Sequence, residues 1–312
     1  MTATNGVAIL GIFVADLAFR ASRQPEMGET ILGSAFKMGP GGKGSNQAVA
    51  AARAGAAVSL ITRLGKDAFG TIALDTWTAE GITARAVLSD SDPTGAAYIF
   101  VSDQTGDNAI IVVPGAAGVI SPADVEAASD SIAAAKVFVT QLEQPLAAAI
   151  RGLEIAREAG VTTIFNPAPA AKLPDAIYPL CDFIIPNETE ATALTGLPVG
   201  NLDEARAAGD ALLARGVGTA LITLGARGAL LHTRDQSILV DSFQAGPVVE
   251  TTGAGDSFVG AFAAALAEGL PPATAARFGA AAAGLSVTRP GTAPAMPYRH
   301  EIASLIGNSD LR

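Results

Sequence analysis

The sequence predicts an α/β fold: a doubly wound, mainly parallel β-sheet flanked by helices, with a small β-sheet lid. Short apolar runs alternate with longer Ala-rich stretches of helical periodicity along most of the chain. Several of the helical stretches end at glycine, the residue that most often terminates a helix. Residues 95–113 depart from the alternation, because two β-rich runs flank a polar loop and no helix follows them.

Each element of the large sheet follows from a local pattern. The expected strands are Val7–Phe13, Ala57–Thr62, Val137–Leu142, Thr162–Phe165, Phe183–Ile185 and Ala220–Leu224. The expected helices between them are Asn46–Ala54, Ala68–Glu80, Leu146–Ala159 and Leu202–Arg215. After Leu224, two short β-rich runs around a polar turn, Gly228–His232 and Ser237–Val240, predict a hairpin at the edge of the sheet.

The lid is expected from segments of about 14–40 and 95–113, which contain extended patterns but no strong helix. An extension of the main sheet is the alternative. We favour a lid, because ligands bind at the carboxyl ends of strands in open α/β sheets and such sites are often covered. No long linker interrupts the 312 residues, so a single domain over 1–312 is expected.

Composition excludes several function classes. The net charge of −10 argues against binding to nucleic acid or to an anionic membrane. Cys181 is the only cysteine, which excludes an internal disulfide and a metal site of several cysteines. His232 and His300 are the only histidines, so His-based zinc sites and Ser-His-Asp triads are disfavoured. The apolar run from Val7 to Val14 stops at Asp16 and predicts a strand rather than a signal peptide or a membrane span. A cytoplasmic location is therefore expected.

The segment Thr251–Phe258 carries the first sign of chemistry. Gly253, Ala254 and Gly255 run into Asp256, and a helical pattern follows. A loop of this kind directs backbone N–H groups and the positive end of the helix dipole at one point. A carboxylate beside such an anion site can take a proton from a hydroxyl that attacks a phosphoryl group. The alternative is that Asp256 only caps the helix.

A second glycine-rich loop lies at Gly39–Gln47. Its Gly-x-Gly-x-x-Gly spacing matches a dinucleotide fingerprint, but no clear buried strand precedes it, so an NAD-binding oxidoreductase is a remote alternative. No Walker A sequence is present. Lys43 and Asn46 at the edge of this loop are hydrogen-bonding groups suited to a polyol. A plain turn with a helix cap is the alternative.

Further polar residues follow the expected strands, where a site in an α/β sheet would lie. Each group alone is typical of a cap or a turn, but five groups at one edge favour a binding site. They are Asp16, Glu143, Asn166–Ala170, Pro186–Glu190 and Thr223–Gly228.

On these motifs, the sequence resembles the ribokinase-like (PfkB) carbohydrate kinases over essentially its whole length. Gly41–Ala48 looks like the N-terminal signature of the family, and Thr252–Phe258 looks like its C-terminal one. Asn166–Ala170 and Pro186–Glu190 are similar to motifs of the ribokinase branch. The resemblance implies ATP-dependent phosphorylation of a sugar hydroxyl, and for the ribokinase branch the primary 5-hydroxyl of ribose.

The resemblance also implies residue roles. Asp256 would be the base, and Gly253, Ala254 and Gly255 the anion hole. The sugar would be held by Asp16, Gly42, Lys43, Asn46 and Glu143 together with Asp256. ATP would be bound by Asn187, Glu190, Thr223, Leu224, Gly225, Ala226, Arg227, Gly228 and Gly255. Glu190 would help to organise Mg²⁺ through water.

A monovalent cation, K⁺, is implied beside the anion hole. Its ligands would be mainly backbone carbonyls of Glu250, Thr252, Ser286, Arg289 and Gly291. The lid also forms a dimer interface in relatives, so a homodimer is expected.

Two residues depart from the ribokinase pattern. Val14 stands where ribokinases usually have Asn, so a lost hydrogen bond could favour a less hydroxylated or differently arranged sugar. Glu250 stands where they usually have Asp, which bears on K⁺ dependence. Fructose, a deoxy-sugar, a sugar acid or a nucleoside are therefore alternative substrates. A phosphorylated sugar fits less well, because Lys43 is the only obvious cation near the loop. The intact Asp256 opposes a non-catalytic binding protein.

Overall fold

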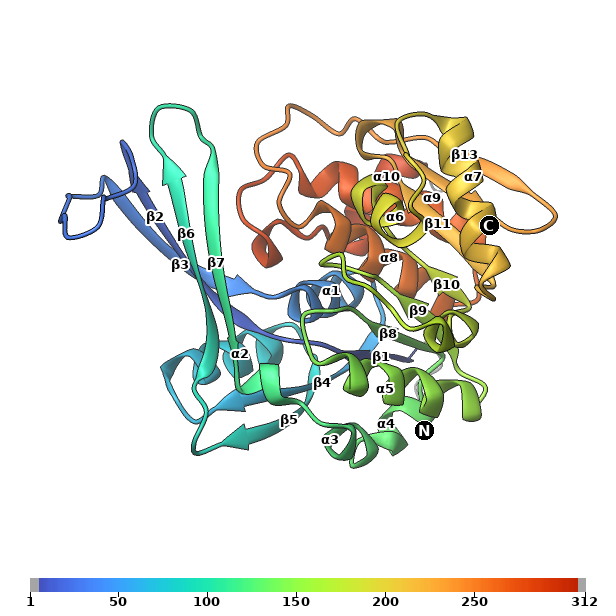
Figure 1. The fold of residues 1–312 in the computed structure, drawn as a ribbon, viewed down its shortest axis with the longest axis horizontal. Helices are drawn as coiled ribbons and strands as arrows, with labels where there is room; N and C mark the ends of the chain where they lie inside the picture. Colours follow the sequence, from blue (N-terminus) through green and yellow to red (C-terminus); the bar gives the residue numbers. More distant parts are fainter. Residues whose placement is uncertain (1–5, 308–312) are drawn as a thin grey trace.

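A computed structural model describes residues 6–307 and contains two separate β-sheets (Figure 1). The large sheet has nine strands in the order β13-β12-β11-β10-β9-β8-β1-β4-β5. These strands are β1 Gly6–Leu10, β4 Ala57–Gly65, β5 Thr83–Ser89, β8 Val137–Thr140, β9 Thr162–Phe165, β10 Phe183–Ile184, β11 Thr219–Thr223, β12 Ala229–His232 and β13 Ser237–Val240. All neighbours from β5 to β11 are parallel, whereas β12 and β13 form the antiparallel edge. The predicted doubly wound sheet and its edge hairpin are confirmed.

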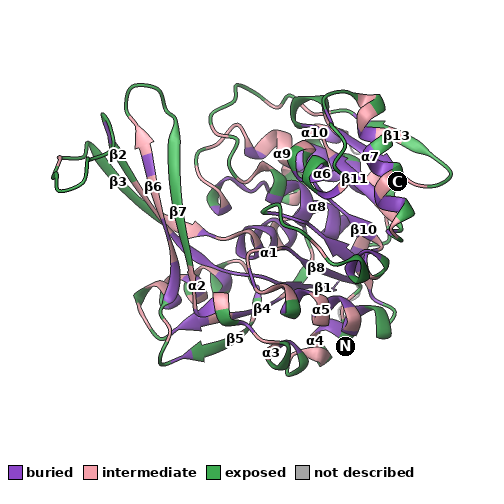
Figure 2. Ribbon diagram, in the orientation of Figure 1, coloured by how far each residue is buried: buried purple, intermediate pink, exposed green. Residues whose placement is uncertain are grey.

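Successive residues of the buried strands point to opposite faces, and each face is covered by its own set of helices. Val7 and Ile9 of β1 belong to one core cluster, and Ala8 and Leu10 belong to the other. The first cluster is covered by α1 Lys43–Arg53, α2 Ala68–Ala79, α8 Ala254–Ala267, α9 Pro272–Ser286 and α10 Arg299–Ile306. The second is covered by α3 Pro122–Glu126, α4 Ser129–Ala133, α5 Leu146–Glu158, α6 Glu188–Thr195 and α7 Leu202–Ala214. Figure 2 shows the buried residues of the strands and of the covering helices in purple.

Short 3₁₀ helices complete the connections: η1 Ala116–Val119, η2 Asp175–Leu180, η3 Gly225–Arg227 and η4 Ala293–Ala295. Within residues 6–307, no helix has the length and apolar character needed to cross a bilayer.

Some predicted boundaries were wrong. The first strand ends at Leu10 rather than at Phe13, because the next three residues lead the chain out of the large sheet toward the small one. The predicted strand Val137–Leu142 ends at Thr140, and Gln141 turns toward the interior between the sheet and α1. Strand β5 was not predicted, because it is a half-exposed edge strand whose apolar residues do not form a continuous run.

The small sheet has the order β3-β2-β6-β7 and stands beside the main body (Figure 1). Its strands are β2 Val14–Ala21, β3 Ala35–Gly41, β6 Thr94–Ser102 and β7 Asn108–Gly115. They come from the two segments expected to form a lid. Because the four strands form their own sheet, the alternative of an extension of the main sheet is wrong.

Helices α1 and α8 pack against each other at very short distance. A Cβ atom on Gly260 of α8 would lie 2.4 Å from the carbonyl oxygen of Gln47 and 2.6 Å from the Cβ of Ala50. Only glycine permits this approach. The contact places the first turns of both helices, which contain the two glycine-rich motifs, next to each other at the carboxyl edge of the sheet.

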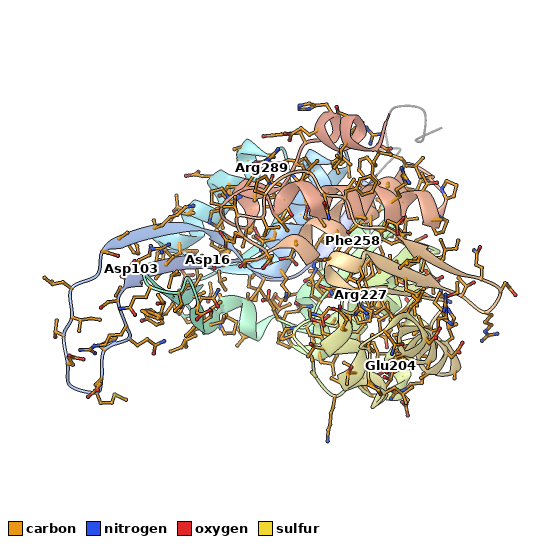
Figure 3. All side chains as sticks on the ribbon, turned by 90° about the horizontal axis from the view of Figure 1, so that it is seen from above. Asp16, Asp103, Glu204, Arg227, Phe258 and Arg289 are labelled. Carbon is orange, nitrogen blue, oxygen red and sulfur yellow. The ribbon has the colours of Figure 1, made fainter. Side chains whose placement is uncertain are left out.

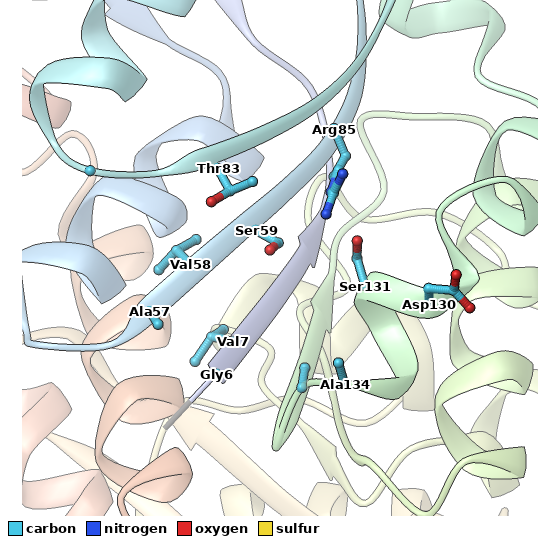
Figure 4. Close-up of a pocket in the computed structure, with 12 residues that line it drawn as sticks. Gly6, Val7, Ala57, Val58, Ser59, Thr83, Arg85, Asp130, Ser131 and Ala134 are labelled. Atoms are coloured by element: carbon cyan, nitrogen blue, oxygen red, sulfur yellow. The ribbon is translucent and has the colours of Figure 1, made fainter. Parts of the chain in front are cut away.

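At the opposite, amino edge of the strands lies a cavity of about 470 Å³ (Figure 4). It is lined by the beginnings of β1, β4 and β5 and by α4, with Ser59, Arg85, Asp130 and Ser131 among its polar residues. None of the chemistry-bearing motifs reaches this end of the molecule.

Candidate active site

The first turn of α8 carries the candidate catalytic carboxylate. Gly253 is the N-cap residue and has φ of 83°, a left-handed conformation that favours glycine. Asp256 is the third residue of the helix and is only 6% exposed. Its carboxylate accepts hydrogen bonds from side chains of α1. The alternative that Asp256 merely caps the helix is therefore wrong.

The backbone N–H groups of this turn differ in whether they have a hydrogen-bond partner. The N–H of Ala254 donates to the carbonyl of Thr251 at 3.2 Å. Those of Gly253, Gly255 and Asp256 have no hydrogen-bond partner within residues 6–307, so of the expected anion hole Gly253 and Gly255 keep unpaired N–H groups and Ala254 does not. Unpaired N–H groups at the N-terminus of a 14-residue helix can bind an anion, and the helix dipole adds to the attraction.

Both oxygens of Asp256 are held by amide side chains of α1. Asn46 Nδ2 donates to Oδ2 at 3.0 Å, and Gln47 Nε2 donates to Oδ1 at 3.0 Å. Asn46 and Gln47 are both buried. These two bonds fix the plane of the carboxylate relative to the first turn of α8, as a base that must meet a hydroxyl in one direction requires.

Lys43 and Glu143 stand next to this carboxylate. The backbone N–H of Lys43 donates to Glu143 Oε2 at 2.7 Å. The negative charge of Asp256 raises the pKa of the Lys43 ammonium against the effect of burial, and Glu143 and Glu190 contribute to the rise. Burial raises the pKa of Glu143 to about 7, although Lys43 opposes the shift. The site thus holds one permanent cation among several carboxyl groups.

Asp16 joins the same cluster from the small sheet. It lies on β2, opposite Gly39 of β3 and Ala97 of β6, where this sheet meets the main body (Figure 3). Burial raises its pKa to about 6, and the charges of Glu250 and Asp256 add to the rise. The carboxyl groups of Asp16, Glu143 and Asp256 are therefore close enough to shift one another's protonation.

A cleft of about 670 Å³ opens between the small sheet and two loops of the main body. Asp16 lines it on one side, and Glu250, Thr252 and Gly291 line it on the other. It has the size expected of a small-molecule site.

Of the residues expected around a monovalent cation, Glu250, Thr252 and Gly291 line the same cleft. The N–H of Gly291 donates to Glu250 Oε2 at 2.8 Å, which joins the two loops that supply them. The carbonyl of Ser286 already accepts from the N–H of Arg289, and the Arg289 side chain pairs with Glu301. Within the described part of the chain, no group of three or more His, Cys, Asp or Glu side chains could hold a metal ion.

The residues expected to bind the nucleotide lie on two adjacent loops. Asn187 caps α6 and forms a reciprocal capping box with Glu190, whose Oε2 lies 2.9 Å from the Asn187 nitrogen. Asn187 also pairs with Thr223 in an isolated parallel bridge, which joins the ends of β10 and β11.

The second of these loops is a closed turn. The N–H of Leu224 donates to the carbonyl of Gly228 at 2.8 Å, and the Leu224 side chain is buried in the core. Leu224 could therefore contact a ligand only through its backbone. Gly225 and Ala226 are exposed. Arg227 bonds to the Gly200 carbonyl and to Glu188.

Gln141 was not singled out from the sequence. It lies immediately after β8 and donates to Gln47 Oε1 at 2.6 Å, and Gln47 in turn donates to Asp256. The signal in the sequence was a glutamine in a segment that otherwise continues the apolar pattern of a strand, and the structure shows that this glutamine is fully buried.

A carboxylate held beside unpaired helix N-terminal amides, at the carboxyl edge of an α/β sheet, is typical of enzymes that transfer a phosphoryl group. The chain belongs to the pfkB family of carbohydrate kinases, whose family model matches residues 4–299.

Several of its relatives match over nearly their full length. The ribokinase of Staphylococcus aureus is 38% identical over 302 residues, covering 96% of this chain and 99% of the relative. The deoxyribokinase of Salmonella typhi is 36% identical over 293 residues, covering 93% and 95%. The structure of Arabidopsis thaliana ribokinase complexed with ribose and ATP aligns with a TM-score of 0.89 at 31% identity, covering 98% of this chain and 99% of the other.

Proposed function

We propose that this protein is an ATP-dependent ribokinase that transfers the γ-phosphate of ATP to the 5-hydroxyl of ribose. The observation that carries the proposal is Asp256, a buried carboxylate whose two oxygens are held by amides beside the unpaired N–H groups of α8. Ribokinases at 37–38% identity over at least 95% of the chain support ribose as the substrate.

The chemistry follows from this arrangement. Asp256 accepts the hydroxyl proton while the hydroxyl oxygen forms a bond to the γ-phosphorus, and the bond from that phosphorus to the leaving ADP oxygen breaks. The unpaired N–H groups of Gly253, Gly255 and Asp256 offset the negative charge on the phosphoryl oxygens. Lys43 adds a positive charge on the same side. Asp16, Gly42, Asn46 and Glu143 bind and orient the sugar.

ATP would contact Asn187, Glu190 and the 223–228 turn at the ends of β10 and β11. Mg²⁺ would arrive with the nucleotide, which needs few protein carboxylates, and Glu190 would help to organise it through water. The loops joined by the bond from Gly291 to Glu250 would present backbone carbonyls to K⁺. Mg²⁺ supplies charge neutralisation on the phosphates when it is bound.

Two further features belong to this proposal. The exposed apolar residues of the small sheet support a homodimer formed through that sheet, which would also act as the lid. A single, buried, free cysteine and an acidic composition support a cytoplasmic enzyme.

The proposal is tested with Asp256→Asn. We expect the variant to lower kcat by about 10²–10⁴-fold, because it removes the general base, while the ribose KM stays close to that of the parent. Steady-state ATP consumption with ribose measures both constants. The control is Asp235→Asn, at an exposed position in the turn between β12 and β13. Parental turnover in Asp256→Asn would show that Asp256 is not the base.

A deoxyribose kinase is the second candidate, and Val14 favours it. This residue is 3% exposed, and β2 places it directly between Gly41 of the glycine-rich loop and Gly95. An apolar side chain there gives no hydrogen bond to a sugar hydroxyl, so the site penalises a missing hydroxyl less. The match to deoxyribokinases at 36% identity supports the same candidate.

The two candidates are separated by comparing kcat/KM for ribose and 2-deoxyribose in the parent and in Val14→Asn. We expect the substitution to raise the preference for ribose by about tenfold, the equivalent of one hydrogen bond. Val87→Asn, at an exposed position on β5, is the control. If the ratio of the two kcat/KM values stays unchanged, Val14 does not select the sugar.

A further inference from the structure

Three buried amide side chains connect the carboxyl edge of the large sheet to Asp256. Gln141 follows β8, Asn166 follows β9, and Gln47 lies on α1 between them. Gln141 Nε2 donates to Gln47 Oε1 at 2.6 Å. Gln47 Nε2 donates both to Asn166 Oδ1 and to Asp256 Oδ1, each at 3.0 Å.

The polarity of this network is set by one backbone group. Asn166 Nδ2 donates to the carbonyl oxygen of Ile185 at 2.8 Å. Because a carbonyl can only accept, Asn166 must turn its amide oxygen toward Gln47. Gln47 must then present its NH₂ group to Asn166, and the same NH₂ group faces Asp256. The opposite orientation would place the Gln47 oxygen against the Asp256 carboxylate, which is repulsive.

Gln141 completes the orientation of Gln47 from the other side. Its side chain is fully buried, and it satisfies the one acceptor that Gln47 has left to pair. Its own Oε1 atom is buried without a hydrogen-bond partner in the described residues. Gln144 nearby has an equally unpaired Oε1 atom, so what distinguishes Gln141 is its bond to Gln47.

We propose that Gln141 is a positioning residue for phosphoryl transfer, acting through Gln47 on the orientation of the Asp256 carboxylate. The inference rests on the proposed role of Asp256 as the base. Without Gln141, the Gln47 amide loses one of the bonds that hold its NH₂ group toward Asp256. The carboxylate can then rotate away from the direction of the incoming hydroxyl, and small misplacements of a catalytic group have large effects on rate.

The test compares Gln141→Met with Gln144→Met. Both positions are buried glutamines in the same segment, but Gln144 donates to Thr140 Oγ1 and to the backbone carbonyl of Gln141, and its side chain is not bonded to Gln47, Asn166 or Asp256. We expect Gln141→Met to lower kcat by about 10- to 100-fold with a near-parental ribose KM. Gln144→Met should keep the parental kcat, even where it lowers the melting temperature equally. A parental kcat in Gln141→Met, or equal losses of kcat in both variants, would overturn the proposal.

A second variant and a double variant sharpen the test. Gln141→Asn keeps the amide but shortens its reach by one methylene group, so its kcat should also fall, which provides the test if the Met variant does not fold. In an Asp256→Asn background, Gln141→Met should cause no further loss, because it acts through Asp256. If the loss of kcat in the double variant equalled the product of the losses in the two single variants, this coupling would be contradicted. If Asp256→Asn itself keeps full turnover, the proposed function fails; if only the Gln141 variants keep it, the positioning role alone fails.

Discussion

At the scale of single residues, burial sets the charge states of the acids around the candidate site. Burial raises the pKa of Asp16 to about 6 and that of Glu143 to about 7. Nearby negative charges, Glu250 and Asp256 in the case of Asp16, add to the effect. A cluster of ionised acids is unfavourable for the free protein, but hydroxyl groups of a sugar could donate hydrogen bonds to it. The ionised acids therefore favour sugar binding but lower the stability of the free protein.

The variant Asp16→Asn separates the effect of this carboxyl on stability from its effect on binding. The folded protein holds the Asp16 proton up to about pH 6, whereas the unfolded chain releases it near the ordinary value of 3.8. The folded state thus binds more protons between these values, so this carboxyl lowers the stability as the pH rises through that window. We expect Asp16→Asn to raise the melting temperature at pH 7.5, to have little effect at pH 3, and to weaken ribose binding.

Thermal unfolding at a series of pH values measures this effect, and calorimetric titration with ribose measures the binding. Asp107→Asn, at an exposed position beside β7, is the matched control and should change neither. A melting temperature that Asp16→Asn lowers at pH 7.5 would contradict the assigned penalty.

At the scale of elements, the small sheet has two different faces. Its inner face carries Asp16 and lines the cleft. The strand pairing places another set of side chains together on its outer face: Phe19, Phe36, Met38, Tyr98 and Ile111. The rings of Phe19 and Phe36 lie 4.9 Å apart, and Phe36 and Ile111 remain 57% and 64% exposed. An apolar face of this kind favours an interface with a second copy of the chain.

Ile111→Glu tests this interface. We expect the parent to sediment as a dimer and the variant as a monomer, because a carboxylate buried in an apolar contact without a partner is strongly unfavourable. Analytical ultracentrifugation measures the masses. Leu239→Glu, on the edge strand β13 of the large sheet and 41% exposed in the parent, should stay dimeric. A monomeric parent would remove the basis for the proposed dimer.

At the scale of the whole molecule, the topology of the large sheet explains where the site lies. From β1 the chain continues to β4 on one side, and β8 pairs with β1 on the other. Crevices form at the carboxyl edge where the strand order reverses in this way. The loops after β1 and β8 and the first turn of α1 meet at this point. Glu143, Lys43 and Asp16 are thereby brought near Asp256, which lies on a helix more than two hundred residues after α1 begins.

Sequence patterns predicted best those elements that are determined by interactions between residues close together in the chain. The strand Thr162–Phe165 was predicted to the residue, and α2, α5 and α7 to within one residue at each end. Gly253–Asp256 and Lys43–Gln47 were recognised because glycine-rich turns and helix starts depend on neighbouring residues. Edge strand β5 and Gln141 were missed. The pairing of β5 and the orientation of Gln141 depend on contacts with residues distant in the chain.

The sequence by itself determined the α/β class, the two glycine-rich motifs and the chemistry available at each, because periodicity and turn composition act over a few residues. Only the tertiary structure decided which groups act together. It joined Asn46 to Asp256 across 210 positions and Gln141 to Gln47 across 94. It also decided the protonation of Asp16 and Glu143 and the exposed face of the small sheet. Burial, hydrogen-bond direction and electrostatic fields depend on distance in space, which a local pattern does not contain.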